Sequence, residues 1–337
     1  MLATLQKGEN MIEVTNLTKK YGDHLAVDDL SFCVEKGQIY GFLGPNGAGK
    51  STTMNIMTGY LAPTKGTVVI NGKDIMKEPE EAKKSIGYLP ELPPLYVDMT
   101  VKEYLRFVAQ LKQVPAKQQD ARIAEVMEMT QITDMQRRLI KNLSKGYKQR
   151  VGLAQAILGD PEVIILDEPT VGLDPKQIIE IRDLIRKLGE NHTVILSSHI
   201  LSEVSAVCDH IMIIAHGKLV ASDSPEGLKK LMSGSAELML TVKGNCEEAK
   251  NVLLAIPEIE LAEQVGEEKD GLCELRVLAK ENTDVREAIF YALAAARLPI
   301  MSLQQTEKTL EDIFLELTED AEPKEVVKKR IFGGKVK

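Results

Sequence analysis

Between Met11 and Ser233 the chain alternates short, continuous apolar runs with amphipathic segments. Three of the apolar runs are rich in β-branched residues and end in polar or glycine-containing turns: GQIYGFLG (37–44), EVIILDEP (162–169) and HTVILSSH (192–199). Such runs are typical of parallel strands that are buried on both faces. MIEVTNLTKKYG, from Met11, predicts a further strand, whereas the chain from Glu103 to Thr130 is strongly helical. The pattern therefore predicts an α/β domain.

The pattern changes at residues 233–235, and the remaining segments predict a smaller domain. In ELMLTVKG the apolar residues alternate, which places Leu238, Leu240 and Val242 on one face of a strand. Asn245 can cap the next helix, and EEKDG between two apolar segments is a hairpin signal. The predicted elements are a strand, a helix, two strands, a helix and a strand, followed by a last helix: ELMLTVKG, the helix after Asn245, the segment around Leu261, LCELRVL, residues 284–297, IMSLQQ and TLEDIFLEL. This order predicts a small α+β domain of the ferredoxin-like type.

Length and charge fit this organisation. A chain of 337 residues is long enough for about two domains. The predicted parts are a flexible leader, a large domain, a smaller domain and a charged tail: residues 1–10, 11–233, 234–318 and 319–337. The leader lacks the apolar centre of a signal peptide, and translation could equally start at Met11. No apolar run approaches the roughly 18–20 residues that span a bilayer, and the net charge of −8 argues against a nucleic-acid partner.

The four cysteines are scattered along the chain and form no CxxC pair: Cys33, Cys208, Cys246 and Cys273. This spacing favours neither a metal site nor a disulfide framework. It predicts buried, reduced thiols in a cytosolic protein.

A phosphate-binding loop is predicted directly after the first buried strand. GPNGAGKST matches the pattern G-x-x-x-x-G-K-[ST] and comprises Gly44, Pro45, Asn46, Gly47, Ala48, Gly49, Lys50, Ser51 and Thr52. Its glycines let successive backbone N–H groups point at phosphate oxygens, and the helix that starts here adds its partial positive charge. We expect Lys50 to reach the β- and γ-phosphates and Ser51 to ligate Mg²⁺, which prefers oxygen ligands.

Charged and polar residues follow the other two buried strands. Asp167 and Glu168 end the apolar run VIIL, where carboxylates need a cation or hydrogen bonds. Asp167 fits the role of holding Mg²⁺, and Glu168 can polarise a water for attack on the γ-phosphate. His199, at the end of TVILSSH, can bridge that water and the phosphate. Lys50, Glu168 and His199 are therefore the predicted catalytic residues.

A second anion site is predicted at LSKGYKQR, where Ser144 and Gly146 start another helix. Taken alone, these eight residues favour a plain capped helix over an anion site. However, the phosphate loop already has its own helix start, so an anion for this second site would have to come from another molecule. Two copies related by a twofold axis would place LSKG of one chain against the ATP of the other.

Together these motifs resemble an ABC transporter ATPase. GPNGAGKST, LSKGYKQR, ILDEPTVGLDP and SSH occur in the order and at about the spacing of that superfamily, over about Met11 to Ser233. IGYLPELPPLYVDMTVKEYL and TLEDIFLELT resemble the ATP-binding subunits of ABC-2 type exporters, the drug-resistance and gliding-associated class. The resemblance implies a P-loop NTPase cassette with a RecA-like core, an antiparallel β subdomain and a helical subdomain. It also implies that Tyr21 stacks on adenine and that Asp174, in GLDP, links the two sites of a dimer.

Two positions depart from the family pattern. Lys145 and Tyr147 replace the usual glycine and glutamine of the LSKGY segment, and Lys145 either adds positive charge near the γ-phosphate or is a solvated lysine. Glu91 stands where the family usually has a glutamine that connects Mg²⁺ to the membrane subunit. We expect Glu91 to keep this role and to make hydrolysis more sensitive to the Mg²⁺ concentration.

The resemblance implies an ATP-driven homodimer that powers separate transmembrane permease subunits from the cytoplasmic face of the membrane. ATP would close the dimer and hydrolysis would reopen it, with the motion passed on around Glu91 to Tyr104. A soluble ABC ATPase that remodels a macromolecular assembly is the alternative. The C-terminal domain is either a packing and dimer-stabilising domain or a sensor of a small ligand, and the sequence does not identify the cargo.

Overall fold

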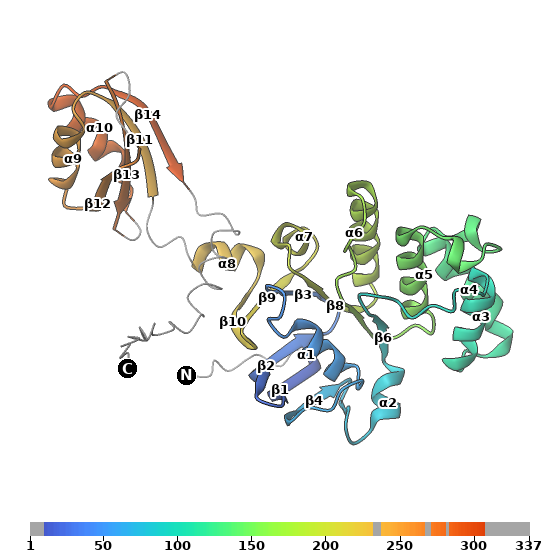
Figure 1. Ribbon diagram of the computed structural model, residues 1–337. Helices are drawn as coiled ribbons and strands as arrows, with labels where there is room; N and C mark the ends of the chain where they lie inside the picture. Colours follow the sequence, from blue (N-terminus) through green and yellow to red (C-terminus); the bar gives the residue numbers. More distant parts are fainter. Residues whose placement is uncertain (1–9, 232–236, 267–270, 281–282, 307–337) are drawn as a thin grey trace, which may run out of the picture. The chain divides into compact units, whose positions relative to one another are not determined.

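The computed structural model describes residues 10–231, 237–266, 271–280 and 283–306, which divide into two compact units between Asp223 and Ser224 (Figure 1). Each unit has a hydrophobic core of its own. The described strands of the first unit are β1 (Asn10–Tyr21), β2 (His24–Glu35), β3 (Ile39–Leu43), β4 (Lys65–Ile70), β5 (Lys73–Asp74), β6 (Ile86–Leu89), β7 (Val163–Leu166), β8 (Thr193–Ser198), β9 (His210–Ala215) and β10 (Lys218–Asp223). Its described helices are α1 (Lys50–Met57), α2 (Pro79–Lys84), α3 (Val101–Leu111), α4 (Ala116–Met129), α5 (Lys145–Ile157), α6 (Pro175–Gly189) and α7 (Leu201–Ser205), with short 3₁₀ turns at Thr133–Met135 and Ile140–Asn142.

The centre of the first unit is a six-stranded sheet in the order β10-β9-β3-β8-β7-β6. All neighbouring strands are parallel except the pair β10 and β9. The three predicted buried strands are β3, β7 and β8, and every residue in them is buried. Because β3 and β7 both pair with β8 in parallel, the residues that follow all three strands meet at one edge of the sheet.

A second sheet in this unit is antiparallel, in the order β2-β1-β4-β5. Strand β1 begins at Asn10, which pairs with Glu35. The prediction that Asn10 belongs to a flexible leader is therefore wrong, and residues 1–9 lie outside the described part of the chain. At the other end of the hairpin Tyr21 pairs with His24, so these two residues flank the β1–β2 turn.

The helical segment between Glu103 and Thr130 is two helices, α3 and α4. The start of α3 is fixed by a capping box, in which Thr100 and Glu103 each hydrogen-bond the other's backbone N–H. The helix cannot continue through Pro115, because proline lacks an N–H and keeps the preceding residue out of the helical region. Helix α4 starts directly after Pro115. Helix α5 then starts at its N-cap Ser144, as predicted.

The second unit contains a four-stranded sheet in the order β12-β13-β11-β14, with every neighbouring pair antiparallel. Its described elements are α8 (Pro225–Leu231), β11 (Glu237–Lys243), α9 (Cys246–Leu254), β12 (Ile259–Gln264), β13 (Leu272–Ala279), α10 (Arg286–Ala295) and β14 (Ile300–Thr306). The predicted cap is confirmed, because the Asn245 side chain accepts a hydrogen bond from the Glu248 N–H at 3.1 Å. The predicted boundary at 233/234, the last helix in 309–317 and the tail 319–337 fall outside the described residues.

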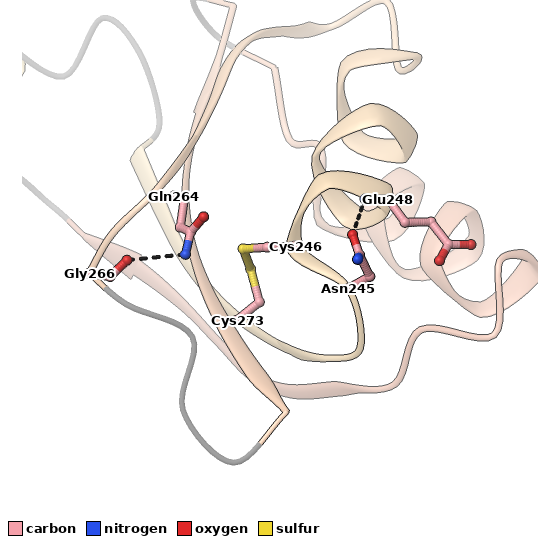
Figure 2. Close-up of a disulfide and its surroundings, with 6 residues drawn as sticks. All are labelled: Asn245, Cys246, Glu248, Gln264, Gly266 and Cys273. Atoms are coloured by element: carbon pink, nitrogen blue, oxygen red, sulfur yellow. Dashed lines mark hydrogen bonds between the residues drawn. A yellow bond between two sulfur atoms is a disulfide. The ribbon is translucent and has the colours of Figure 1, made fainter.

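The prediction of four reduced cysteines is wrong for two of them. Cys246, the first residue of α9, and Cys273, in β13, form a disulfide with their Cα atoms 5.4 Å apart (Figure 2). They are 27 residues apart in the sequence, and only the packing of the helix start against the sheet brings them together. Cys33 and Cys208 are free.

Candidate functional site

The loop between β3 and α1 wraps around the amine of Lys50. The Lys50 Nζ donates to the carbonyl oxygens of Gly44 at 2.8 Å and Pro45 at 3.2 Å, and the side chain is 5 % exposed. Gly49, the N-cap of α1, has a φ of 104°, and a Cβ there would lie 2.5 Å from the carbonyl oxygen of Ala26. Glycine is therefore required at this position for both its conformation and its close approach to the neighbouring strand.

A cavity of about 380 Å³ opens beside this loop. The predicted site residues that line it are Tyr21, Asn46, Gly47, Gly49, Lys50, Ser51, Thr52, Glu91, Glu168 and His199. The cavity is also lined by His24, Ala26 and Val171, which sequence reasoning did not select. His24 could have been found from its position, because a hairpin that presents Tyr21 at its turn also presents the residue paired with it.

Asp167 does not itself line the cavity, but it accepts two hydrogen bonds, one of them from the lining residue Ser51. Its Oδ1 atom accepts from the Ser51 hydroxyl at 3.2 Å and from the Ser197 hydroxyl at 2.6 Å, and the residue is 3 % exposed. The Ser51 hydroxyl and the Asp167 carboxylate are oxygen donors that converge at the start of α1. This donor set fits a hard divalent cation such as Mg²⁺.

Glu168 occupies the centre of the site. Its carboxylate lies 3.5 Å from the Lys50 Nζ through Oε1 and 3.0 Å from the His199 Nδ1 through Oε2. Its φ of 48° is in the left-handed region, and its N–H donates to the Ser197 hydroxyl at 2.9 Å. That conformation costs roughly 1–2 kcal/mol for a non-glycine residue, so the surrounding hydrogen bonds hold it. A buried carboxylate between a cation and a histidine can accept a proton from a water molecule.

Ser144, Gly146 and Asp174 gather at a different place. Ser144 caps α5 and Asp174 caps α6, by accepting from the N–H groups of Tyr147 and Gln177 at 3.4 and 3.0 Å. The Gln177 side chain lies over Gly146, where a Cβ would be 2.5 Å from its Oε1 atom. None of these three predicted site residues lines the cavity that the described residues form.

Lys145, the departure from the family pattern, lies beside the loop that precedes α6. A Cβ on Gly172 would be 2.0 Å from the Lys145 Nζ. Gly172 has a φ of 71°, so its lack of a side chain suits both its backbone conformation and the approach of the lysine. The LSKG segment and the GLDP segment are therefore packed against each other within one chain.

Comparisons with known proteins decide the family. The ABC transporter family profile matches residues 27–171. The linearmycin resistance ATP-binding protein LnrL of Bacillus subtilis (strain 168) is 34% identical over 309 residues, which cover 91% of this chain and 98% of LnrL. The chain is an ABC transporter ATP-binding protein.

Other similar proteins support the same family assignment. The bacitracin transport ATP-binding protein BcrA of Bacillus licheniformis is 42% identical over 222 residues, which cover 65% of this chain and 72% of BcrA. The solved dimer of the cassette MJ0796 bound to ADP and Pi matches with a TM-score of 0.59 and 26% identity, and covers 64% of this chain and 98% of that cassette. The chemistry of this ABC ATPase is the binding and hydrolysis of ATP, which confirms the predicted enzyme class.

Proposed function

We propose that this ABC ATPase powers a separate membrane exporter of the ABC-2 type by closing as a head-to-tail homodimer on two ATP molecules. The main support for the proposal is that the predicted anion-binding residues form two groups at different places in one chain. The Lys50 loop lines the cavity, whereas Ser144 and Gly146 do not, although both sets lie at helix starts. A second copy can bring the missing helix start to the cavity. The dimeric MJ0796 cassette supports this arrangement by its likeness to the chain.

Each group at the cavity then has a role. The N–H groups of the loop and the Lys50 amine bind the phosphates, and the Tyr21 ring, which is 46% exposed, stacks on adenine. Ser51 and Asp167 would hold Mg²⁺, which neutralises phosphate charge when bound. Glu168 accepts the proton of the attacking water, and His199 orients that water. Asp174, at the start of α6, links the two sites across the dimer.

Glu91 would be a further ligand of the cation. It lines the same cavity as Ser51, and a carboxylate there adds a negative charge where the family usually has a neutral amide. We therefore expect the Glu91→Gln variant to reach half-maximal ATPase activity at a different Mg²⁺ concentration from the parent protein. An identical Mg²⁺ titration of the two proteins would remove Glu91 from the metal site.

The permease would contact the surface that follows Glu91. Leu92, Tyr96 and Val97 are large apolar side chains that are 77, 55 and 44% exposed. Leu92 also lines a second cavity of about 750 Å³. A cluster of exposed apolar side chains is typical of a surface that binds another protein. Binding through this surface would place the ATPase at the cytoplasmic face of its partner. Among the described residues no helix combines the length and apolar character needed to cross a membrane.

The C-terminal unit would stabilise the dimer. Its order of strands and helices and its sheet order β12-β13-β11-β14 support a ferredoxin-like domain. Removing residues 234–337 should weaken ATP-dependent dimerisation, whereas a ligand sensor would change the response to that ligand instead.

The resistance and transport functions in the names of LnrL and BcrA support export of a toxic compound.

The Glu168→Gln variant tests the central proposal. Glutamine keeps the shape of the side chain but cannot accept the proton, so ATP should remain bound and hold the dimer closed. We expect a dimer by light scattering with saturating ATP and Mg²⁺, and a monomer with ADP. A Gly146→Arg change in the same variant is the control, because it should block dimer formation. A Glu168→Gln protein that stays monomeric with ATP would refute the head-to-tail arrangement.

A further inference from the structure

A buried acid outside the predicted site joins the two segments that carry the reacting groups. Glu203, in the first turn of α7, is 7% exposed. Its Oε2 atom accepts a hydrogen bond from the Thr170 hydroxyl at 2.5 Å and another from the Ser198 hydroxyl at 3.2 Å. Thr170 lies two residues after Glu168, and Ser198 lies directly before His199. One carboxylate oxygen therefore holds the chain next to both members of the Glu168–His199 pair.

The alternation of side chains along β8 explains why two neighbouring serines bind different acids. Successive residues of a strand point to opposite faces of the sheet. The Ser197 hydroxyl donates to Asp167 and accepts from the N–H of Glu168. Ser198 points the other way and reaches Glu203, while it also accepts from the Ile200 N–H at 3.0 Å. The end of β8 is thus fixed from both faces.

Helix α7 packs directly on the central sheet, which fixes the backbone position of Glu203. A Cβ on Gly41, in β3, would lie 2.1 Å from the Val204 Cγ1 atom, so the glycine lets α7 lie directly on the strand. Leu201 and Val204 are buried, 5% and 0% exposed, on either side of Glu203. These packed neighbours fix the position of the backbone that carries the Glu203 carboxylate.

We propose that Glu203 is a positioning residue for ATP hydrolysis, which keeps the His199 ring within hydrogen-bond distance of the Glu168 carboxylate. Without it, the chain after Glu168 and the chain before His199 would each lose the hydrogen bond that ties it to α7. The 3.0 Å contact between His199 and Glu168 spans these two segments, so it would be lost for part of the time. The inference rests on the proposed roles of Glu168 and His199.

Steady-state ATP hydrolysis by the full chain tests this role. For Glu203→Ala we expect kcat to fall by about 10- to 100-fold with the KM for ATP changed less than about twofold, because misplacement of reacting groups lowers the rate rather than binding. Glu203→Gln should recover most of the activity, because its amide oxygen can still accept both hydrogen bonds. Ser202→Ala, an exposed neighbour on the same helix, is the matched control and should keep the parent rate. Thr170→Val should lower kcat by removing one anchor, and it serves the same purpose if Glu203→Ala does not fold.

Combination with His199→Ala separates positioning from general damage. If Glu203 acts through His199, adding Glu203→Ala to His199→Ala should lower kcat less than twofold further. Losses that multiply in the double variant, a parent-like kcat in Glu203→Ala and Thr170→Val, or an effect on KM alone would each overturn the inference. The single variants Glu168→Gln and His199→Ala test the proposed function independently. If both kept the parent kcat, the assigned roles of those two residues would fail, whereas a lowered kcat in both beside a parent-like kcat in Glu203→Ala would refute the inference alone.

Discussion

Gly146 offers a test in which folding and function should separate. A Cβ at this position would lie 2.5, 2.7 and 2.8 Å from the Oε1, Cδ and Nε2 atoms of Gln177. These atoms form the far end of a flexible side chain, so a shift of Gln177 relieves the overlap at a cost of roughly 0.5–1.5 kcal/mol. Alanine in place of glycine in a helix gains about 0.5–1 kcal/mol. The two effects nearly cancel, so the free energy of unfolding of Gly146→Ala should stay within about 1 kcal/mol of the parent value.

The same methyl group should be harmful in the dimer. In the proposed assembly Gly146 approaches the triphosphate bound to the other copy, where a Cβ would take the space of a phosphate oxygen. We expect the melting temperature to change by less than about 4 °C and the ATPase activity to fall more than tenfold. The Glu168→Gln, Gly146→Ala double variant should not dimerise with ATP in light scattering.

The Gln177→Ala substitution shows whether a loss of ATPase activity in Gly146→Ala arises within the chain or at the contact with the partner's nucleotide. Combined with Gly146→Ala it removes the overlap inside the chain and leaves the methyl group at the surface. Activity that returns in this double variant would mean that the damage came from within the protomer. Either that recovery, or full activity of Gly146→Ala alone, would refute the idea that Gly146 meets the partner's nucleotide.

Two further predictions concern the packing of each unit. Gly41→Ala should lower the free energy of unfolding by about 1–3 kcal/mol through overpacking against Val204. Urea denaturation measures this loss, and adding Val204→Ala should restore part of the free energy of unfolding. No recovery in the double variant would mean that the overlap lies elsewhere. Removing the Cys246–Cys273 disulfide, which closes 27 residues of chain, should destabilise the second unit by about 3.5 kcal/mol and leave ATPase activity unchanged. Scanning calorimetry with and without reductant measures the first effect, and an equal shift in the unfolding of both units would contradict the assignment.

The location of the candidate site could be predicted because its residues follow buried strands. The apolar runs that precede Gly44, Asp167 and His199 predicted parallel strands, and the carboxyl ends of parallel strands meet at one edge. Lys50, Glu168 and His199 all line one cavity, as their positions after these strands implied. Local signals such as the Ser144 and Asn245 caps were equally predictable, because a cap acts within a few residues of its position.

Contacts that depend on packing between distant elements could not be predicted in this way. Glu203 looks like an ordinary polar residue of a short helix, and only the placement of α7 on β3 turns it toward Thr170. The disulfide likewise depends on how the start of α9 meets β13. The periodic pattern of apolar residues does not predict such contacts, because the sequence of each element is also compatible with a different packing.

The separation of the Lys50 loop from Ser144 also has a kinetic consequence if the proposed dimer is correct. When free chains are scarce relative to their dissociation constant, each turnover requires an encounter, so the hydrolysis rate rises with the square of the protein concentration. A permease that carries two docking sites removes this dependence, because tethering gives short-range effective concentrations in the millimolar range. Wasteful consumption of ATP by unattached chains is then suppressed by dilution alone.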